Sequence, residues 1–174
     1  MRNFNFGVLA AAALALAAPA AAAQSTSGQD LTPEGHGAYV AVAGATDLFA
    51  IQSAELAIEK ARQPEIRTFA QTMLAEHRSA LARLGEAAQA VGLSELLPPA
   101  MLPMHWDMLR DLGGASGSRF DDIYVDQQVE AHEVAVELHR NFAANGHNAR
   151  RKDYAGTTLP MAIRHLAEAR RLEQ

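Results

Sequence analysis

Apolar residues recur at steps of three and four over four long stretches of the chain, the spacing of one face of an α-helix. The first stretch runs from about residue 36 to 62, and its stripe contains Leu48, Ile51, Glu55 and Ile58. This spacing places the carboxylate of Glu55 on the face expected to be buried. The Gln63-Pro64 pair predicts a break here, because proline is well tolerated at the first position of a new helix.

The second stretch predicts a helix from about residue 64 to 91, with Gly92 as its stop. A single histidine, His77, stands in the middle of its apolar stripe. The other members of the stripe are Ile66, Ala70, Met73, Ala80, Leu84, Ala88 and Val91.

A long crossover follows, from Gly92 to Gly117, because prolines and glycines interrupt the pattern there. One short amphipathic helix is expected inside it, at about residues 104–112. Ser118 then opens the third long helix, and Asp121 completes a start that resembles a capping box. Val125, Val129, His132, Val136 and His139 share one face of this helix, which is expected to end near Asn145-Gly146.

The last helical region covers about residues 148–172, and Pro160 interrupts it. We expect a kink or a restart there, with Thr157 or Thr158 as the cap of the restarted helix. No stretch alternates between apolar and polar residues as a strand would. The chain is therefore predicted to be all-α, and two helical hairpins joined by a long crossover that contains a short helix indicate a ferritin-like four-helix bundle over residues 36–174.

The N-terminal end reads as an export signal. Arg2 precedes a short apolar stretch from Gly7 to Ala18, and Ala21-x-Ala23 matches a cleavage site. We expect residues 1–23 to be a signal peptide cleaved after Ala23, residues 24–35 to be a flexible polar tether, and the mature protein to be periplasmic or secreted, with no remaining membrane span.

Removal of residues 1–23 would leave 151 residues with 14 basic and 20 acidic side chains, a net charge of −6. The chain has no cysteine, which excludes a disulfide framework, a thiolate metal site and an iron–sulfur cluster. An acidic composition without a basic stripe also argues against nucleic acid as a partner.

Glu55, His77, His132 and His165 occupy core positions on four different predicted helices. With a rise of about 1.5 Å per residue, His77 and His132 are expected in one layer and Glu55 and His165 in a neighbouring one. These depths carry an error of about one helical turn, so a single elongated site and two stacked pairs both stay open. Imidazoles and a carboxylate suit iron, copper or zinc, and thioethers of nearby methionines shift the preference toward copper. The alternative is a hydrogen-bonded polar cluster that is purely structural, with Gln128 as a further member.

Other residues with possible chemistry are peripheral in this reading. Asp121 is first a residue of the helix start, with a metal-binding role as its second interpretation. Met73 and Met161 are expected beside the four polar groups, and Tyr124 lies closer to the start of its helix. Four further histidines fall near loops, helix ends or outer faces: His36, His105, His139 and His147.

Three segments resemble the exported bacterial ferritin-like family named domain of unknown function 4142: residues 49–77, 120–132 and 159–166. The resemblance implies a periplasmic or secreted four-helix domain in which Glu55, His77, Asp121, His132 and His165 occupy recurrent polar positions. It implies no settled activity. The chain departs from the di-iron ferritins, because it has no Glu-x-x-His motif and few inward carboxylates, so a ferroxidase is disfavoured.

Three functions remain open at this point. The first is an exported protein that binds a transition metal ion in its core through histidine and glutamate. The second is an envelope stress or interaction module whose polar cluster only fixes helix register, with an unidentified protein partner. The third is an oxidoreductase acting on peroxide or a redox metal, with Tyr124 as an electron relay; whether the protein is an enzyme is not decided by the sequence.

Overall fold

The computed structural model describes residues 36–90, 92–93 and 100–174. The predicted signal peptide and tether lie outside these residues. The described part contains five helices and no strand, which confirms the predicted all-α class. Their bounds are α1 His36–Lys60, α2 Pro64–Gln89, α3 Pro103–Gly114, α4 Ser118–Asn145 and α5 Ala149–Leu172.

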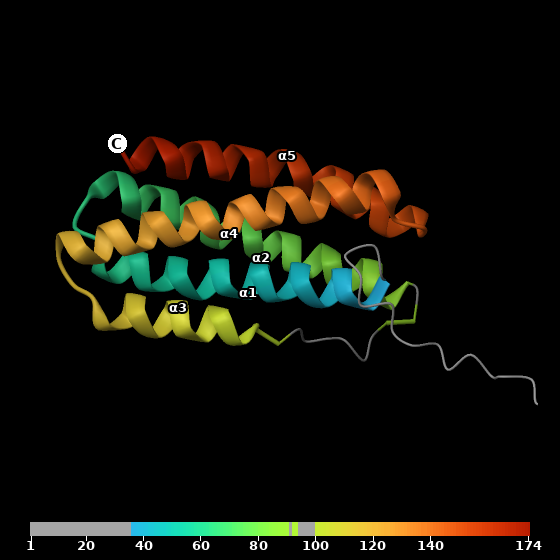
Figure 1. Ribbon diagram of the computed structural model, residues 1–174, viewed down its shortest axis with the longest axis horizontal. Helices are drawn as coiled ribbons and strands as arrows, with labels where there is room; N and C mark the ends of the chain where they lie inside the picture. The colour runs from blue at the N-terminus through green and yellow to red at the C-terminus, as the bar shows by residue number, and fades with distance from the viewer. Residues whose placement is uncertain (1–35, 91, 94–99) are drawn as a thin grey trace, which may run out of the picture.

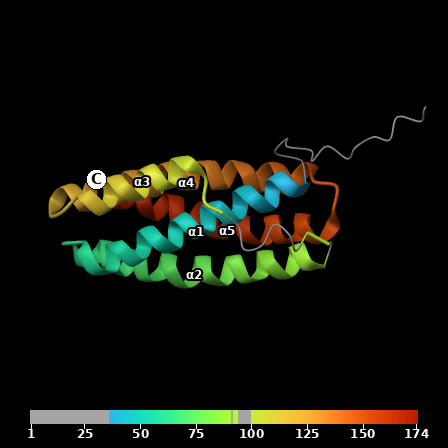
Figure 2. The ribbon, with the colours of Figure 1, turned by 90° about the horizontal axis from the view of Figure 1, so that it is seen from below.

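Four long helices lie side by side (Figure 1), and their buried apolar residues form shared clusters. Helix α1 packs on α2 and α4, and α5 packs on α4 and α2. The short α3, in the predicted crossover, lies outside this group against α1 and α4, as the rotated view shows (Figure 2). The turn between α1 and α2 lies at the same end as the start of α4 and the end of α5. Helices α1 and α5 therefore run toward this end and α2 and α4 away from it, as predicted.

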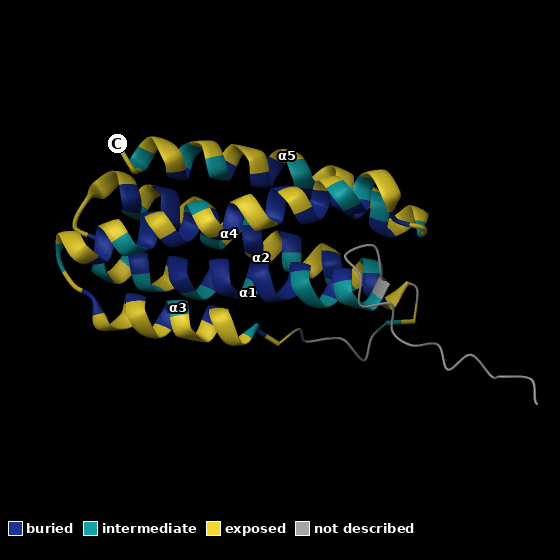
Figure 3. Ribbon diagram, in the orientation of Figure 1, coloured by how far each residue is buried: buried dark blue, intermediate teal, exposed yellow. Residues whose placement is uncertain are grey.

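The buried face of α1 differs from the predicted one. The predicted stripe is wrong by one position, since Glu55 is exposed and Leu48 and Ile58 are only partly buried. Alanines and one aspartate form the face that packs against the other long helices, and Figure 3 shows the buried inner faces. The members of this face are Ala43, Asp47, Ala50, Ala54, Ala57 and Ala61.

The larger aliphatic residues of α1 serve a second interface. Leu48 and Leu56 pack against a cluster that contains Phe49 and the α3 residue Leu109. Helix α1 is thus covered on two sides, and its sequence carries two apolar faces. By length and composition, residues Gly37–Lys60 would suffice to cross a membrane, but 56% of the most apolar window is buried inside the protein, as in a core helix.

Helix α5 runs through Pro160 without a restart. The predicted cap at Thr157 or Thr158 is therefore wrong. Thr157 Oγ1 instead donates to the carbonyl of Tyr154 within the helix, at 3.0 Å. The helix begins at a different cap, the Asn148 side chain, which accepts a hydrogen bond from the backbone N–H of Arg151.

Candidate metal centre

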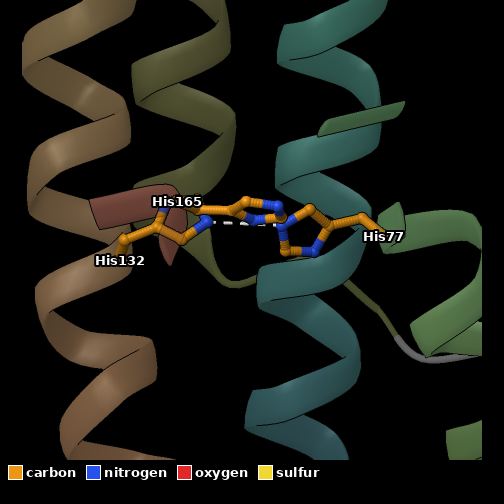
Figure 4. A group of neighbouring side chains, drawn as sticks. All are labelled: His77, His132 and His165. Atoms are coloured by element: carbon orange, nitrogen blue, oxygen red, sulfur yellow. Dashed lines mark hydrogen bonds between the residues drawn. The ribbon is translucent and has the colours of Figure 1, made fainter. Parts of the chain in front are cut away.

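Three buried histidines from three helices meet in the interior. Helix α2 presents His77 from the middle of its buried stripe, α4 presents His132 and α5 presents His165. The three residues are at most 2% exposed. One ring nitrogen of each lies within 4.8 Å of one ring nitrogen of the others, and Figure 4 shows the rings facing a common point.

The spacing of the rings suits a shared ion. Nε2 of His77 lies 3.3 Å from Nε2 of His132. Two nitrogens bound to one ion at about 2.0–2.1 Å are about 3.3–3.4 Å apart when the angle at the ion is tetrahedral. The ring of His165 completes the group, with its centroid 5.2 Å from that of His77 and 5.3 Å from that of His132.

Each ring is oriented by a contact at its other nitrogen. Nδ1 of His77 lies 2.8 Å from a carboxylate oxygen of Asp47 on α1. Nδ1 of His132 donates to the backbone carbonyl of Gln128, also at 2.8 Å. For His165 the roles of the nitrogens are exchanged, because Nε2 contacts Glu76 at 2.9 Å and the buried Nδ1 has no hydrogen-bond partner among the described residues. Three nitrogens therefore remain for an ion: Nε2 of His77, Nε2 of His132 and Nδ1 of His165.

Hydrogen-bond chemistry fixes one tautomer. The Gln128 carbonyl can only accept, so the proton of a neutral His132 lies on Nδ1 and its Nε2 carries a lone pair. Nε2 of His77 faces that lone pair at 3.3 Å. Without an ion, the hydrogen bond between the two nitrogens therefore has Nε2 of His77 as its donor. A bound cation would replace the proton between the rings.

Burial keeps the imidazoles of His132 and His165 neutral. It lowers the pKa of His132 well below its ordinary value, and the adjacent His77 and His165 lower it further. Burial and the proximity of His77 lower the pKa of His165 to about 4, although Glu76 acts in the opposite direction. A neutral imidazole is the form that binds a metal ion. The group is thus ready to coordinate at neutral pH without losing protons from these two rings.

Asp47 connects the histidines to a deeper polar group. Burial raises the pKa of its carboxyl, while the hydrogen bond from His77 lowers it. Its second oxygen lies 3.4 Å from the hydroxyl of Tyr154 on α5. Nearby, the Tyr39 hydroxyl and Nδ1 of His139 are 3.0 Å apart. Aspartate and tyrosine groups thus fix the side of the centre that faces away from the α1–α2 turn.

Glu55 does not belong to the centre, contrary to prediction. Its carboxylate lies 2.7 Å from Arg78 on the surface, and its side chain is 48% exposed. The α1 carboxylate that reaches the interior is Asp47, two helical turns earlier. Asp47 shares a helical stripe with the small residues Ala43, Ala50 and Ala54, and this stripe could have indicated its burial. The large aliphatic residues beside the stripe gave the stronger pattern.

The expected depth of His165, in the layer next to that of His77 and His132, also differs from the structure. His165 lies beside His77 and His132 because side chains lean toward the N-terminus of their helix. Helix α5 runs opposite to α2 and α4, so its side chain leans toward theirs and the three rings converge. The expected depths were counted from backbone positions along the helix axes and did not include this tilt of the side chains.

Asp121 performs the helix-start role in a different helix from the one expected. Its carboxylate is 1% exposed and accepts from the backbone N–H groups of Arg62 and Gln63, at 2.9 and 3.1 Å. It ties the start of α4 to the start of α2 and does not belong to the group of three histidines that could hold a metal ion. Glu76, which contacts His165, was also not predicted as a site residue. Acidic residues next to a buried stripe are usually solvated, so the sequence does not indicate this contact.

The remaining candidates are placed as follows. His105 and His139 are buried, contrary to prediction, and His105 stacks on Phe49 with ring centroids 5.0 Å apart. Met73 and Met161 are buried one helical turn before His77 and His165. The Tyr124 hydroxyl is buried without a hydrogen-bond partner among the described residues.

Comparisons with known proteins give a fold and a family. No curated protein matches the chain. A structure of CopM in its Cu(II)-bound form has a TM-score of 0.65 at 18% sequence identity, and the match covers 79% of this chain and 95% of that one. A structure of CopM in its Ag-bound form has a TM-score of 0.60 at 17% identity, covering 77% and 91%. At this identity the likeness shows a shared fold. The family of the domain of unknown function DUF4142 matches residues 16–172, and the chain therefore belongs to that family.

Proposed function

We propose that the protein binds one transition metal ion through Nε2 of His77, Nε2 of His132 and Nδ1 of His165. The observation that carries this proposal is that the two nitrogens of each ring have different surroundings. One nitrogen contacts a neighbouring residue, and the other is left for the shared interior. Metal-binding histidines in proteins have this arrangement, because the outer hydrogen bond fixes the tautomer and the direction of the ring.

The structural alternative accounts for less of the geometry. A polar cluster that only fixes helix register should satisfy its buried atoms, since an unsatisfied one costs about 1–3 kcal/mol. Nδ1 of His165 is buried without a hydrogen-bond partner in the described structure. An ion at the centre would use this nitrogen and would also bind the facing nitrogens of His77 and His132 at their present spacing.

We propose copper as the ion to test first. Among divalent ions, copper binds nitrogen sites most tightly, and thioethers favour its reduced form. The thioethers of Met73 and Met161 are buried one turn from two of the ligands. The similar CopM structures hold Cu(II) and Ag, which agrees with this choice. Zinc and iron remain alternatives, although the absence of a carboxylate from the described metal-binding group disfavours a di-iron ferritin site.

The test is metal content and affinity of the untagged chain. Titration calorimetry and elemental analysis should give one copper per chain, and the His77→Ala/His132→Ala variant should lose it. A matched variant, His36→Ala/His147→Ala, also removes two imidazoles but should keep the copper. Thermal unfolding of both variants without metal checks that each folds. Equal copper content in the two variants would refute the assignment.

We also propose that the protein is exported and that its fold is ferritin-like. The export pattern of residues 1–23 supports the first part, and the two helix pairs α1–α2 and α4–α5, joined by a crossover that carries α3, support the second. Cell fractionation with N-terminal sequencing tests export. A mature chain that begins at Gln24 is expected, and an intact N-terminus in the cytoplasm would contradict it.

A further inference from the structure

A groove between α2 and α5 reaches from the surface to one of the three histidines. It encloses about 710 Å³. Its lining combines threonines and charged side chains of both helices with Phe69 and His165. His165 is thus at once a wall residue of this groove and a member of the candidate metal centre.

Glu76 links the surface to His165. Its side chain is 35% exposed, whereas that of His165 is 2% exposed. Oxygen Oε2 lies 2.9 Å from Nε2 of His165 and 2.5 Å from the guanidinium of Arg164, which is itself exposed. One carboxylate oxygen therefore has two competing partners, the buried imidazole and a surface cation.

The other two rings have no comparable exposed contact. Nδ1 of His77 is covered by Asp47, which is 4% exposed. Nδ1 of His132 is covered by the backbone of its own helix at Gln128. Of the three groups that hold the outer nitrogens, Glu76 is the one whose side chain reaches solvent.

We infer that metal ions reach the three histidines from the α2–α5 groove, and that the carboxylate of Glu76, one helical turn beyond the groove residue Thr72, is the first ligand an incoming ion meets. This inference rests on the proposed metal binding and adds a route to it. Carboxylate oxygens bind divalent transition ions. The imidazole of His165 donates its Nε2 proton to this carboxylate and keeps the lone pair of Nδ1 for the proposed centre, so Glu76 lies directly beside an inner ligand.

Arg164 acts against loading in this arrangement. Its guanidinium contacts Oε2 of Glu76 and places a positive charge at the groove, which weakens the attraction of this carboxylate for an incoming cation. Removal of the Arg164 charge should therefore speed metal uptake, whereas removal of the Glu76 charge should slow it. A general loss of structure would change the uptake rate in the same direction in both variants, so opposite changes support the route.

The experiment is stopped-flow uptake of Cu²⁺ by the untagged chain, followed by absorbance. We expect Glu76→Gln to lower the association rate constant about five- to tenfold and Arg164→Gln to raise it about two- to fivefold. The Glu55–Arg78 pair is a matched control on another surface, with a contact of 2.7 Å. Glu55→Gln and Arg78→Gln report the effect of net charge alone and should change the rate less than twofold.

The release rate separates access from ring orientation. Slower access lowers binding and release rates together and leaves Kd nearly unchanged, whereas a misoriented His165 would release the ion faster and raise Kd. A bulky residue at the groove gives a second test: Ala167→Trp should slow uptake, and Ala82→Trp, at an exposed alanine outside the groove lining, should not.

Two results would overturn the inference. If Glu76→Gln and Ala167→Trp take up copper as fast as their matched controls, this route is wrong while metal binding stands. If the wild-type chain takes up no copper, zinc or iron, the proposed function and the route both fail.

Discussion

Asp47 on α1 and His77 on α2 face each other across the helix interface, with a carboxylate oxygen 2.8 Å from Nδ1 of the ring. The contact is almost completely buried, with 5% and 3% of the two side chains exposed. It turns Nε2 of His77 toward His132 and His165. The direction of one proposed metal ligand is thus set by an aspartate that the apolar pattern of α1 did not reveal.

Replacement of Asp47 should weaken metal binding without removing a ligand. Substitution of residues that orient metal-binding histidines typically costs about 10–100-fold in affinity. We expect Asp47→Asn to raise the Kd for copper within this range, measured by calorimetry. Glu55→Gln removes the same charge from the surface of the same helix and should leave Kd unchanged. Equal affinities for the two variants would show that Asp47 does not orient the ligand.

Metal binding should release a proton at neutral pH. Without an ion, a proton lies between Nε2 of His77 and Nε2 of His132, and the ion takes its place. Calorimetric titration in two buffers of different ionisation enthalpy measures this quantity. We expect about one proton released per copper. Heats that do not depend on the buffer would contradict the proton arrangement derived from the Gln128 carbonyl.

Acid should destabilise the metal-free protein. Burial lowers the pKa of His165 and of His139 to about 4 in the folded state, compared with about 6.5 when unfolded. The unfolded chain therefore binds more protons below pH 6.5, so the stabilisation is present above that pH and is lost as the pH falls toward 4.

By pH 5 each of the two histidines should lower the free energy of unfolding by about 1–2 kcal/mol relative to pH 7.5. Thermal unfolding at several pH values checks this, and His139→Gln should reduce the dependence. A midpoint that stays constant between pH 7.5 and 5 would show that these imidazoles are not held neutral by folding.

Asp121 should matter for stability and not for metal. Its carboxylate satisfies two backbone N–H groups at the start of α2, and truncation of such a group costs about 1–3 kcal/mol. We expect Asp121→Ala to lower the free energy of unfolding by this amount and to keep one copper per chain. Asp122→Ala, at an exposed neighbouring position, is the control and should change stability by less than about 0.5 kcal/mol. Loss of copper in Asp121→Ala at unchanged stability would reverse this assignment.

Long helices with one apolar stripe were predictable from the sequence. The spacing of the large apolar residues located His77 and His132 correctly, because the predicted stripes of α2 and α4 lie on faces that are buried between the long helices. Helix α1 contacts its neighbours on two sides, and alanines form the inner face. Its large aliphatic residues face α3, which drew the prediction to Glu55 and away from Asp47.

The contacts between helices were not predictable from spacing alone. Pro160 lies inside α5, although proline usually ends a helix. The convergence of His165 with the other two histidines depends on the lean of side chains in helices that run in opposite directions. The contact of Glu76 with His165 depends on how α2 and α5 pack, since it joins two residues that are far apart in the sequence.

Anomalous diffraction from crystals of the copper-loaded chain tests the metal centre most directly. The account predicts one strong peak at the copper edge, about 2.0 Å from Nε2 of His77, Nε2 of His132 and Nδ1 of His165. A peak held by other residues, or none at the three histidines in fully loaded protein, would contradict it.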